Sequence, residues 1–521
     1  MRRSLPPLLG AMVLASLLSG LPAQAAPATV PTSPPLTWTE CPPDPFGTPV
    51  DPRLRCTTLK APLDYRAPRG ATIDIAVSRM RTAKPGLRRG ILLHNAGGPG
   101  GASLNLPSSY VHVYPQDILD RYDLVSFDPR GVGYSSPVTC GRTWDQLPNE
   151  VYLPFPAPDG SIDANVTFAR DLARDCLAEG GREIRYVTTA NTARDMDRIR
   201  VALGESKVSY NSGSYGSYLG AVYATMFPER TDRFVIDSNV DPGGIWQDQW
   251  RMWDPGAELR FTDFAKWAVA QDPALGATPD KVRTNFLALA DRLDRAPVTH
   301  PKAGQVNGNL FRAAYRGYSY NVVFFPEIAA WWHFVEGTGP APDWFDFPVL
   351  PGIPADNEVA VQVAVTCGDI GSPRRIDQYR REVREDRAKY PILAGMGANV
   401  RACAFWPDPV EPPVRVTDRG PDNILILQNL RDPATPYAGA LGMRRALGHR
   451  ARMITVDAGN HGVYDPSTPS CAVTETDRFL TTGALPRRDL FCKPDPAPPV
   501  RNDTLARITL AASGVSLSDI G

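Results

Sequence analysis

Short apolar segments recur along the chain, and most of them lead into a turn and then a helix-forming stretch. They cover residues 90–94, 123–127, 208–210, 233–237, 424–427 and 453–456. Strands that are apolar on both faces belong in the middle of a parallel sheet with helices on either side. We therefore predict an α/β fold in which helices cover both faces of a mostly parallel sheet.

This alternation breaks off in the middle of the chain. From about residue 244 to residue 400 the sequence reads helical and aromatic, which indicates a helical lid insertion. The predicted organisation is a Pro-rich leader over residues 26–55, a first core part over 56–243, the lid over 244–400, and a second core part over 401–521. Seven of the ten tryptophans lie in the insertion: Trp246, Trp250, Trp253, Trp267, Trp331, Trp332 and Trp344.

The N-terminus has the pattern of a Sec-type signal peptide. Arg2 and Arg3 precede an apolar run over residues 8–21, and Ala23-Gln24-Ala25 follows as a cleavage site. The apolar run is too short for a ~20-residue membrane-spanning helix. We predict secretion to the extracellular space with cleavage after Ala25, and no membrane association afterwards.

Composition and motifs exclude several classes of function. Lys+Arg and Asp+Glu both total 56, so the formal net charge is zero and no basic excess exists to bind nucleic acid. Metal-ligand spacings such as His-Glu-x-x-His or Cys-x-x-Cys are absent from the sequence. We therefore expect no metal and no cofactor, and we expect a monomer.

The strongest chemical signal is the run Ser212-Gly213-Ser214-Tyr215-Gly216, between a strand and a helix. A nucleophile elbow needs small residues two positions before and after its serine, because the sharp turn presses them against backbone. Ser214 meets this condition, with Ser212 and Gly216 around it. Ser212 and Ser217 have tyrosine or leucine at these positions and do not.

A serine nucleophile needs a base and an acid, which in this topology follow it along the chain. His461 lies in a glycine-containing loop after the last apolar segment, whereas His449 lies in an Arg-rich helical end and reads as a surface residue. Asp432 follows the preceding strand and would orient His461. Asp457 is the less favoured alternative acid.

An oxyanion formed at Ser214 needs backbone N–H donors. The N–H of Tyr215 should be one of them. The other should come from the glycine cluster over residues 97–101, where Pro99 has no N–H. Gly98 is the preferred donor, and Gly97 and Gly100 remain alternatives. No Gly-Lys-Ser/Thr follows the cluster, so a phosphate-binding loop is excluded.

Together these segments resemble the secreted actinobacterial tripeptidyl aminopeptidases, relatives of the proline iminopeptidases in the α/β-hydrolase superfamily. The matching stretches are residues 97–101, 128–135, 212–220, Tyr223, 237–242, 432–436 and 459–462. The resemblance implies an α/β-hydrolase core and an exopeptidase that releases short peptides, usually tripeptides, from the free N-termini of peptides or proteins. It assigns Ser214 as nucleophile, Asp432 as acid and His461 as base. Two places depart from the pattern of the family: Asn95-Ala96 before the glycines, and Ser212 at the elbow. Either departure could change the acyl pocket.

An aminopeptidase must also bind the ammonium group of its substrate, for which a carboxylate in or near the lid is suited. The carboxylates considered are Asp248, Asp254, Glu258, Glu327, Glu336 and Asp369. Asp369 is preferred because the family often has a Cys-x-Asp motif at this place, here Cys367-Gly368-Asp369.

Eight cysteines in an exported protein are expected to form disulfides, but eight allow 105 pairings, so the connectivity does not follow from the sequence. The sequential pairing would be Cys41–Cys56, Cys140–Cys176, Cys367–Cys403 and Cys471–Cys492. Two other functions remain open: a secreted esterase or lipase with the same machinery, and an inactive α/β-hydrolase fold used for binding.

Overall fold

The computed structural model describes residues 36–44, 49–147, 153–343 and 351–493. The predicted signal peptide with its cleavage site at Ala25, the start of the leader, and Trp344 lie outside these ranges. Among the helices of the described ranges, none has the length and apolar character needed to cross a membrane.

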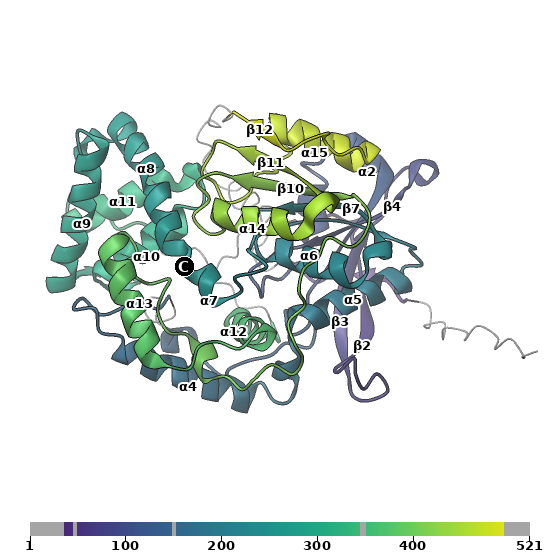
Figure 1. Cartoon of the computed structure of the whole chain (residues 1–521), viewed down its shortest axis with the longest axis horizontal. Coiled ribbons are helices and arrows are strands. Elements are labelled where there is room, and N and C mark those ends of the chain that lie inside the picture. The colour runs from purple at the N-terminus through teal and green to yellow at the C-terminus, as the bar shows by residue number, and fades with distance from the viewer. Residues whose placement is uncertain (1–35, 45–48, 148–152, 344–350, 494–521) are drawn as a thin grey trace, which may run out of the picture. The chain divides into compact units, whose positions relative to one another are not determined.

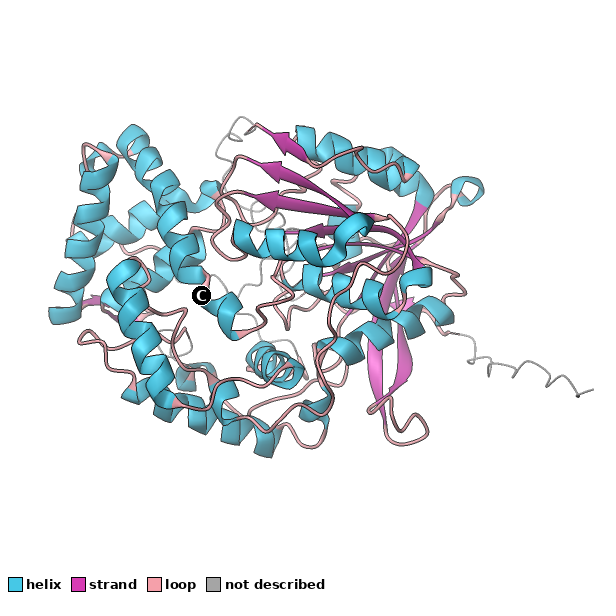
Figure 2. Ribbon diagram, viewed as in Figure 1, coloured by secondary structure: helices cyan, strands magenta, loops and turns pink. Residues whose placement is uncertain are grey.

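A ten-stranded sheet forms the centre of the fold (Figures 1 and 2). Seven neighbouring strands, in the order β5-β4-β6-β7-β10-β11-β12, are parallel, and β1-β2-β3 join the β5 edge in antiparallel fashion. The predicted mostly parallel sheet is confirmed. The strands are β1 (Thr39–Glu40), β2 (Arg55–Pro62), β3 (Thr72–Met80), β4 (Gly90–Asn95), β5 (Tyr122–Phe127), β6 (Val208–Gly213), β7 (Thr231–Asp237), β10 (Ile424–Asn429), β11 (Ala451–Val456) and β12 (Leu490–Cys492).

Helices cover both faces of this sheet. On β10, Ile424 and Ile426 point into a large core shared with α5, α6 and α14, while Leu425 and Leu427 pack with α1, α2 and α15 on the other face. Alternate burial of apolar residues on two faces is what a central strand requires. The helices are α1 (Leu106–Tyr110), α2 (Gln116–Arg121), α5 (Thr189–Ala202), α6 (Tyr215–Met226), α14 (Tyr437–Leu447) and α15 (Cys471–Thr482).

Between β7 and β10 the chain forms a helical insertion, seen on the left and lower side of Figure 1. The helix α4 (Asp163–Glu179), which precedes β6 in the chain, packs against the end of this insertion. The insertion consists of α7 (Gln247–Arg251), α8 (Trp253–Gln271), α9 (Pro279–Arg295), the hairpin β8 (Val298–His300) and β9 (Gly304–Val306), α10 (Gly308–Tyr318), α11 (Phe325–Glu336), α12 (Asn357–Asp369) and α13 (Ile376–Lys389).

Four disulfides stabilise the described part of the chain. They join Cys41 to Cys56, Cys140 to Cys176, Cys367 to Cys403, and Cys471 to Cys492, which are the pairs of the sequential arrangement. The first of them ties down part of the predicted leader, where Thr39–Glu40 pairs with β2 as β1.

Candidate active site

The turn between β6 and α6 is the sharp elbow that the sequence predicts. Ser214 occupies it with φ 56° and ψ −130°, a backbone conformation that is unusual for a residue with a side chain. A Cβ on Gly216 would lie 1.8 Å from the Oγ of Ser212, so only glycine fits two positions after Ser214. The elbow directs Ser214 to the carboxyl end of the parallel sheet, where ligands bind in open α/β folds.

Asp432 and His461 come together at the same sheet edge, after β10 and β11. The Nδ1 of His461 lies 2.9 Å and 3.0 Å from the two carboxylate oxygens of Asp432, and both side chains are fully buried. Asp432 also accepts hydrogen bonds from the backbone N–H groups of Ala434 and Thr435 and from the Thr435 hydroxyl. These three donors and the His461 ring together fix the orientation of the Asp432 carboxylate.

The two alternatives weighed from the sequence lie elsewhere. Asp457 forms an ion pair with Arg431. His449 is exposed and lies 3.5 Å from Asp422. Among these candidates, therefore, Asp432 and His461 are the pair that the fold brings together.

Asp237, at the end of β7, joins the serine elbow to the histidine loop. Its carbonyl accepts the N–H of Ser214 at 3.0 Å, and its carboxylate accepts the N–H groups of Val463 and Tyr464 at 2.8 Å. Burial raises the pKa of this carboxyl group to about 6. Residue 237 lies in one of the stretches that match the family, residues 237–242. Nothing in the sequence, however, indicates that its side chain joins the elbow to the histidine loop.

The glycine cluster after β4 lies beside the elbow, because β4 and β6 are neighbours in the sheet. The N–H of Gly97 donates to the Oδ1 of Asn95, and the N–H of Gly101 donates to the carbonyl of Gly97. Gly98 has φ 99°. Gly100 packs so closely against α12 that a Cβ would meet the Glu358 carbonyl at 2.8 Å. Of the candidate donors in this loop, the N–H of Gly97 is thus already engaged, whereas Gly98 and Gly100 both remain candidates.

The helical insertion contacts both the acid loop and the histidine loop. The Tyr320 carbonyl accepts the N–H of His461 at 2.7 Å, and the two rings meet edge to face with centroids 5.0 Å apart. Trp253 on α8 donates its indole N–H to the Ala434 carbonyl at 2.8 Å. The insertion thereby helps to set the positions of the two loops that carry Asp432 and His461.

Asp369 lies at the end of α12, beneath the elbow helix. Its carboxylate accepts hydrogen bonds from the N–H and hydroxyl of Thr189 and from the indole of Trp246. The Thr189 hydroxyl lies in turn 2.9 Å from the Tyr215 hydroxyl. Burial raises the pKa of Asp369 to about 7. Protein donors therefore surround this carboxyl group, and it ties α5 and α12 to the start of the insertion.

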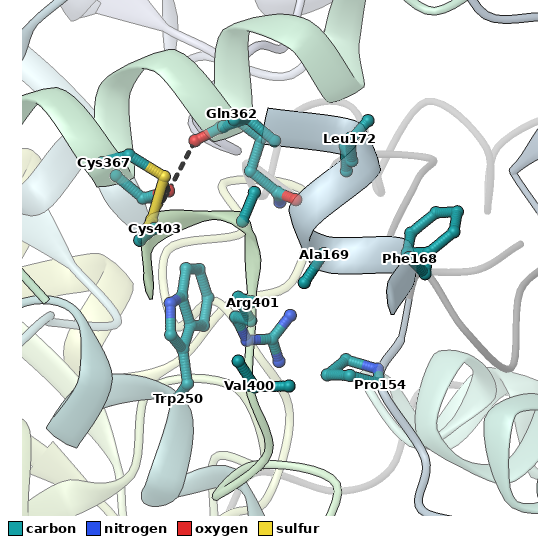
Figure 3. Close-up of a pocket in the computed structure, with 13 residues that line it drawn as sticks. Pro154, Phe168, Ala169, Leu172, Trp250, Gln362, Cys367, Val400, Arg401 and Cys403 are labelled. Atoms are coloured by element: carbon teal, nitrogen blue, oxygen red, sulfur yellow. Dashed lines mark hydrogen bonds between the residues drawn. A yellow bond between two sulfur atoms is a disulfide. The ribbon is translucent and has the colours of Figure 1, made fainter. Parts of the chain in front are cut away.

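A separate cavity of about 40 Å³ lies between α4, α12 and the segment around Cys403 (Figure 3). Trp250 and Arg401 face it, and the Cys367–Cys403 disulfide lines it. Ser214, Asp432 and His461 are not among its lining residues. This cavity is therefore distinct from the candidate catalytic centre.

Comparison with known proteins agrees with this arrangement. A family model described as TAP-like protein matches residues 390–492, which include Asp432 and His461. The tripeptidyl aminopeptidase of Streptomyces lividans is 34% identical over 484 residues, covering 89% of this chain and 87% of that protein. The chain belongs to the tripeptidyl aminopeptidase family. It is a serine peptidase of the α/β-hydrolase type, as the sequence motifs predicted.

More distant members of this group differ in their described activities. The serine protease Hip1 of Mycobacterium tuberculosis is 27% identical, with 88% of this chain and 91% of that protein covered. Carboxylesterase B of the same organism is 30% identical, with 84% of this chain and 86% of that protein covered.

Proposed function

We propose that this protein is a secreted exopeptidase that releases tripeptides from the free N-termini of peptides. Ser214 attacks the scissile carbonyl, and His461 accepts its proton and passes it to the leaving amine. Asp432 holds the His461 ring and stabilises the imidazolium that forms. The N–H groups of Gly98 and Tyr215 stabilise the oxyanion, and water then hydrolyses the acyl-enzyme.

The observation that carries this proposal is the buried Asp432–His461 pair, joined through Asp237 to the elbow at Ser214. A carboxylate that holds Nδ1 leaves Nε2 as the nitrogen that exchanges protons with a nucleophile. The four disulfides support the exported state, since such bonds persist in oxidising compartments.

The test is loss of turnover in Ser214→Ala and His461→Ala with an unchanged melting temperature. Removing the serine or histidine of such a triad lowers kcat by roughly 10⁶-fold in a well-studied serine protease. His449→Ala is the matched control, because this histidine is exposed and lies away from the site. A Ser214→Ala protein that still cleaves Ala-Pro-Ala p-nitroanilide would refute the assignment.

The proposed exopeptidase needs a carboxylate for the substrate ammonium. Glu358 on α12 is better suited than Asp369, because it is half-buried and packs directly against Gly100 in the glycine loop. With its raised pKa of about 7, Asp369 carries only part of a negative charge at neutral pH.

Glu358→Gln should therefore raise KM for peptides with a free N-terminus by roughly tenfold, the value of one charge-assisted hydrogen bond. N-acetyl peptides should be poor substrates of both proteins. Asp369→Asn is the matched comparison and should change KM less than Glu358→Gln does. The reverse order of effects would return the ammonium site to Asp369.

An esterase is the second candidate, favoured by the similarity to carboxylesterase B. Ester and amide hydrolysis use the same three residues, so Ser214→Ala cannot separate the two functions. The two functions are separated by comparing the hydrolysis rates of Ala-Pro-Ala p-nitroanilide and p-nitrophenyl butyrate. A higher kcat/KM for the simple ester, with no effect of N-acetylation on the peptide, would favour the esterase.

A further inference from the structure

Arg316 on α10 differs from the other deeply buried arginines of this protein. Its side chain is 1% exposed, yet none of its three guanidinium nitrogens has a hydrogen-bond partner among the described residues. By contrast, Arg130 makes two bonds of 2.7 Å to Asp195, and Arg260 bonds Ser319 and Asp263. A buried guanidinium without partners is costly, so this one is suited to a ligand that supplies them.

Aromatic rings hold the Arg316 guanidinium in place. Its central carbon lies 4.0 Å from the centroid of the Trp253 ring and 4.9 Å from that of Tyr320. Stacking occupies the faces of a planar guanidinium and leaves the N–H groups along its edge for an acceptor in the same plane. A carboxylate is the planar anion that matches this edge with two parallel hydrogen bonds.

The same two rings connect Arg316 to the catalytic loops. Tyr320 packs against His461 with ring centroids 5.0 Å apart, and Trp253 bonds the carbonyl of Ala434 beside Asp432. The guanidinium is thus one aromatic ring away from the proposed base. In a serine peptidase the histidine protonates the leaving amine, so groups beyond it meet the leaving half of the substrate.

We propose that Arg316 binds a carboxylate carried by the part of the peptide that follows the scissile bond. The inference rests on the proposed exopeptidase function and narrows its substrates to peptides with a negative charge close after the cleavage point. The carboxylate has two possible sources, the C-terminus of a short peptide or an acidic side chain.

Matched substrates separate these sources. Ala-Pro-Ala-Ala is compared as free acid and as C-terminal amide, and Ala-Pro-Ala-Glu-amide is compared with Ala-Pro-Ala-Gln-amide. Ala-Pro-Ala p-nitroanilide has a neutral leaving group and serves as reference. The wild-type protein should prefer the charged member of at least one pair in kcat/KM by roughly ten- to a hundredfold, as charge-assisted hydrogen bonds allow.

The variant Arg316→Met keeps an elongated apolar side chain between the rings and removes the donors. It should abolish the preference and keep kcat/KM on the p-nitroanilide within about threefold of wild type. Arg316→Lys keeps the charge without the planar fork and should retain part of the preference. Arg401→Met is the control, because Arg401 also stacks on aromatic rings, those of Trp250 and Trp253. This variant should leave the substrate preference intact.

The outcomes are distinct for the two proposals. No preference in either pair, or an equal loss on all substrates in Arg316→Met, would overturn the carboxylate site. A preference for the free acid alone assigns the C-terminus, and a preference for the glutamate peptide alone assigns a side chain. If the wild-type protein cleaves neither the p-nitroanilide nor any of the four peptides, the exopeptidase function itself has failed.

Discussion

At the scale of single residues, the steric limits of the elbow decide which substitutions the nucleophile tolerates. Gly216→Ala would place a Cβ 1.8 Å from the Ser212 Oγ and 2.8 Å from its Cβ. Overpacking of this kind costs about 1–3 kcal/mol in stability. We expect a lower unfolding midpoint in urea and loss of peptidase activity, since the clash displaces the turn that carries Ser214.

A second substitution tests the steric explanation for this loss. Ser212→Gly removes the atoms in the way, after which the nearest side-chain atom is the Tyr210 hydroxyl at 3.3 Å. The double variant should therefore recover part of the stability that Gly216→Ala loses, a coupling that a double-mutant cycle measures. Additive losses in the cycle would contradict the steric explanation.

The residues of the site differ in how far the sequence alone could predict them. The elbow was predictable because its requirement is local, with small residues at fixed positions around Ser214. The positions of Asp432 and His461 followed from their order after late strands. By contrast, the approach of Glu358 to Gly100 and of Arg316 to Tyr320 depends on how the insertion packs, for which the sequence gives no spacing rule.

At the scale of elements, the end of β7 connects the elbow to the histidine loop through Asp237. The pKa of Asp237 is raised by burial from 3.8 to about 6. The folded state therefore binds its proton more tightly than the unfolded state does. Stability from this group is fully present below pH 3.8 and is lost as the pH rises through 6, by about 3 kcal/mol in total.

Asp237→Asn removes this titration and keeps an oxygen that can accept the N–H groups of Val463 and Tyr464. As the pH falls from 7 to 4, the wild-type protein should therefore become more stable relative to the variant, measured as the difference between their free energies of unfolding. Urea unfolding of both proteins at the two pH values measures this difference. Asp128, whose pKa burial also raises to about 6, is present in both proteins and cancels. A difference that does not change with pH would contradict the assignment.

Element boundaries show a second limit of prediction from sequence. The segments 90–94 and 424–427 were predicted as strands because their apolar runs are continuous, and they form β4 and β10. The start of α5 is harder to place from the sequence: Thr188 is the cap, with its hydroxyl accepting the N–H of Asn191. Several residues here can cap a helix, and the tertiary contact of Thr189 with Asp369 helps to set where α5 begins.

At the scale of the whole molecule, a charged network fastens the insertion to the catalytic core. Asp263 on α8 pairs with Arg260 of the same helix and with Arg431, the residue before Asp432. Arg260 also donates to Asn460, the residue before His461. The insertion could be recognised in the sequence by its change in composition, whereas this attachment joins residues more than 150 positions apart.

Asp263→Asn should weaken this attachment, because it leaves the guanidinium groups of Arg260 and Arg431 close together without the shared carboxylate. We expect a loss of about 2 kcal/mol in the free energy of unfolding, since hydrogen bonds to charged groups contribute 1.5–3 kcal/mol. We also expect a fall in kcat, as the loops of Asp432 and His461 lose a common anchor. Asp377→Asn is the control, because Asp377 is 74% exposed in its pair with Arg380 and should cost under about 1 kcal/mol. Equal effects of the two substitutions on stability and kcat would show that the network does not anchor the catalytic loops.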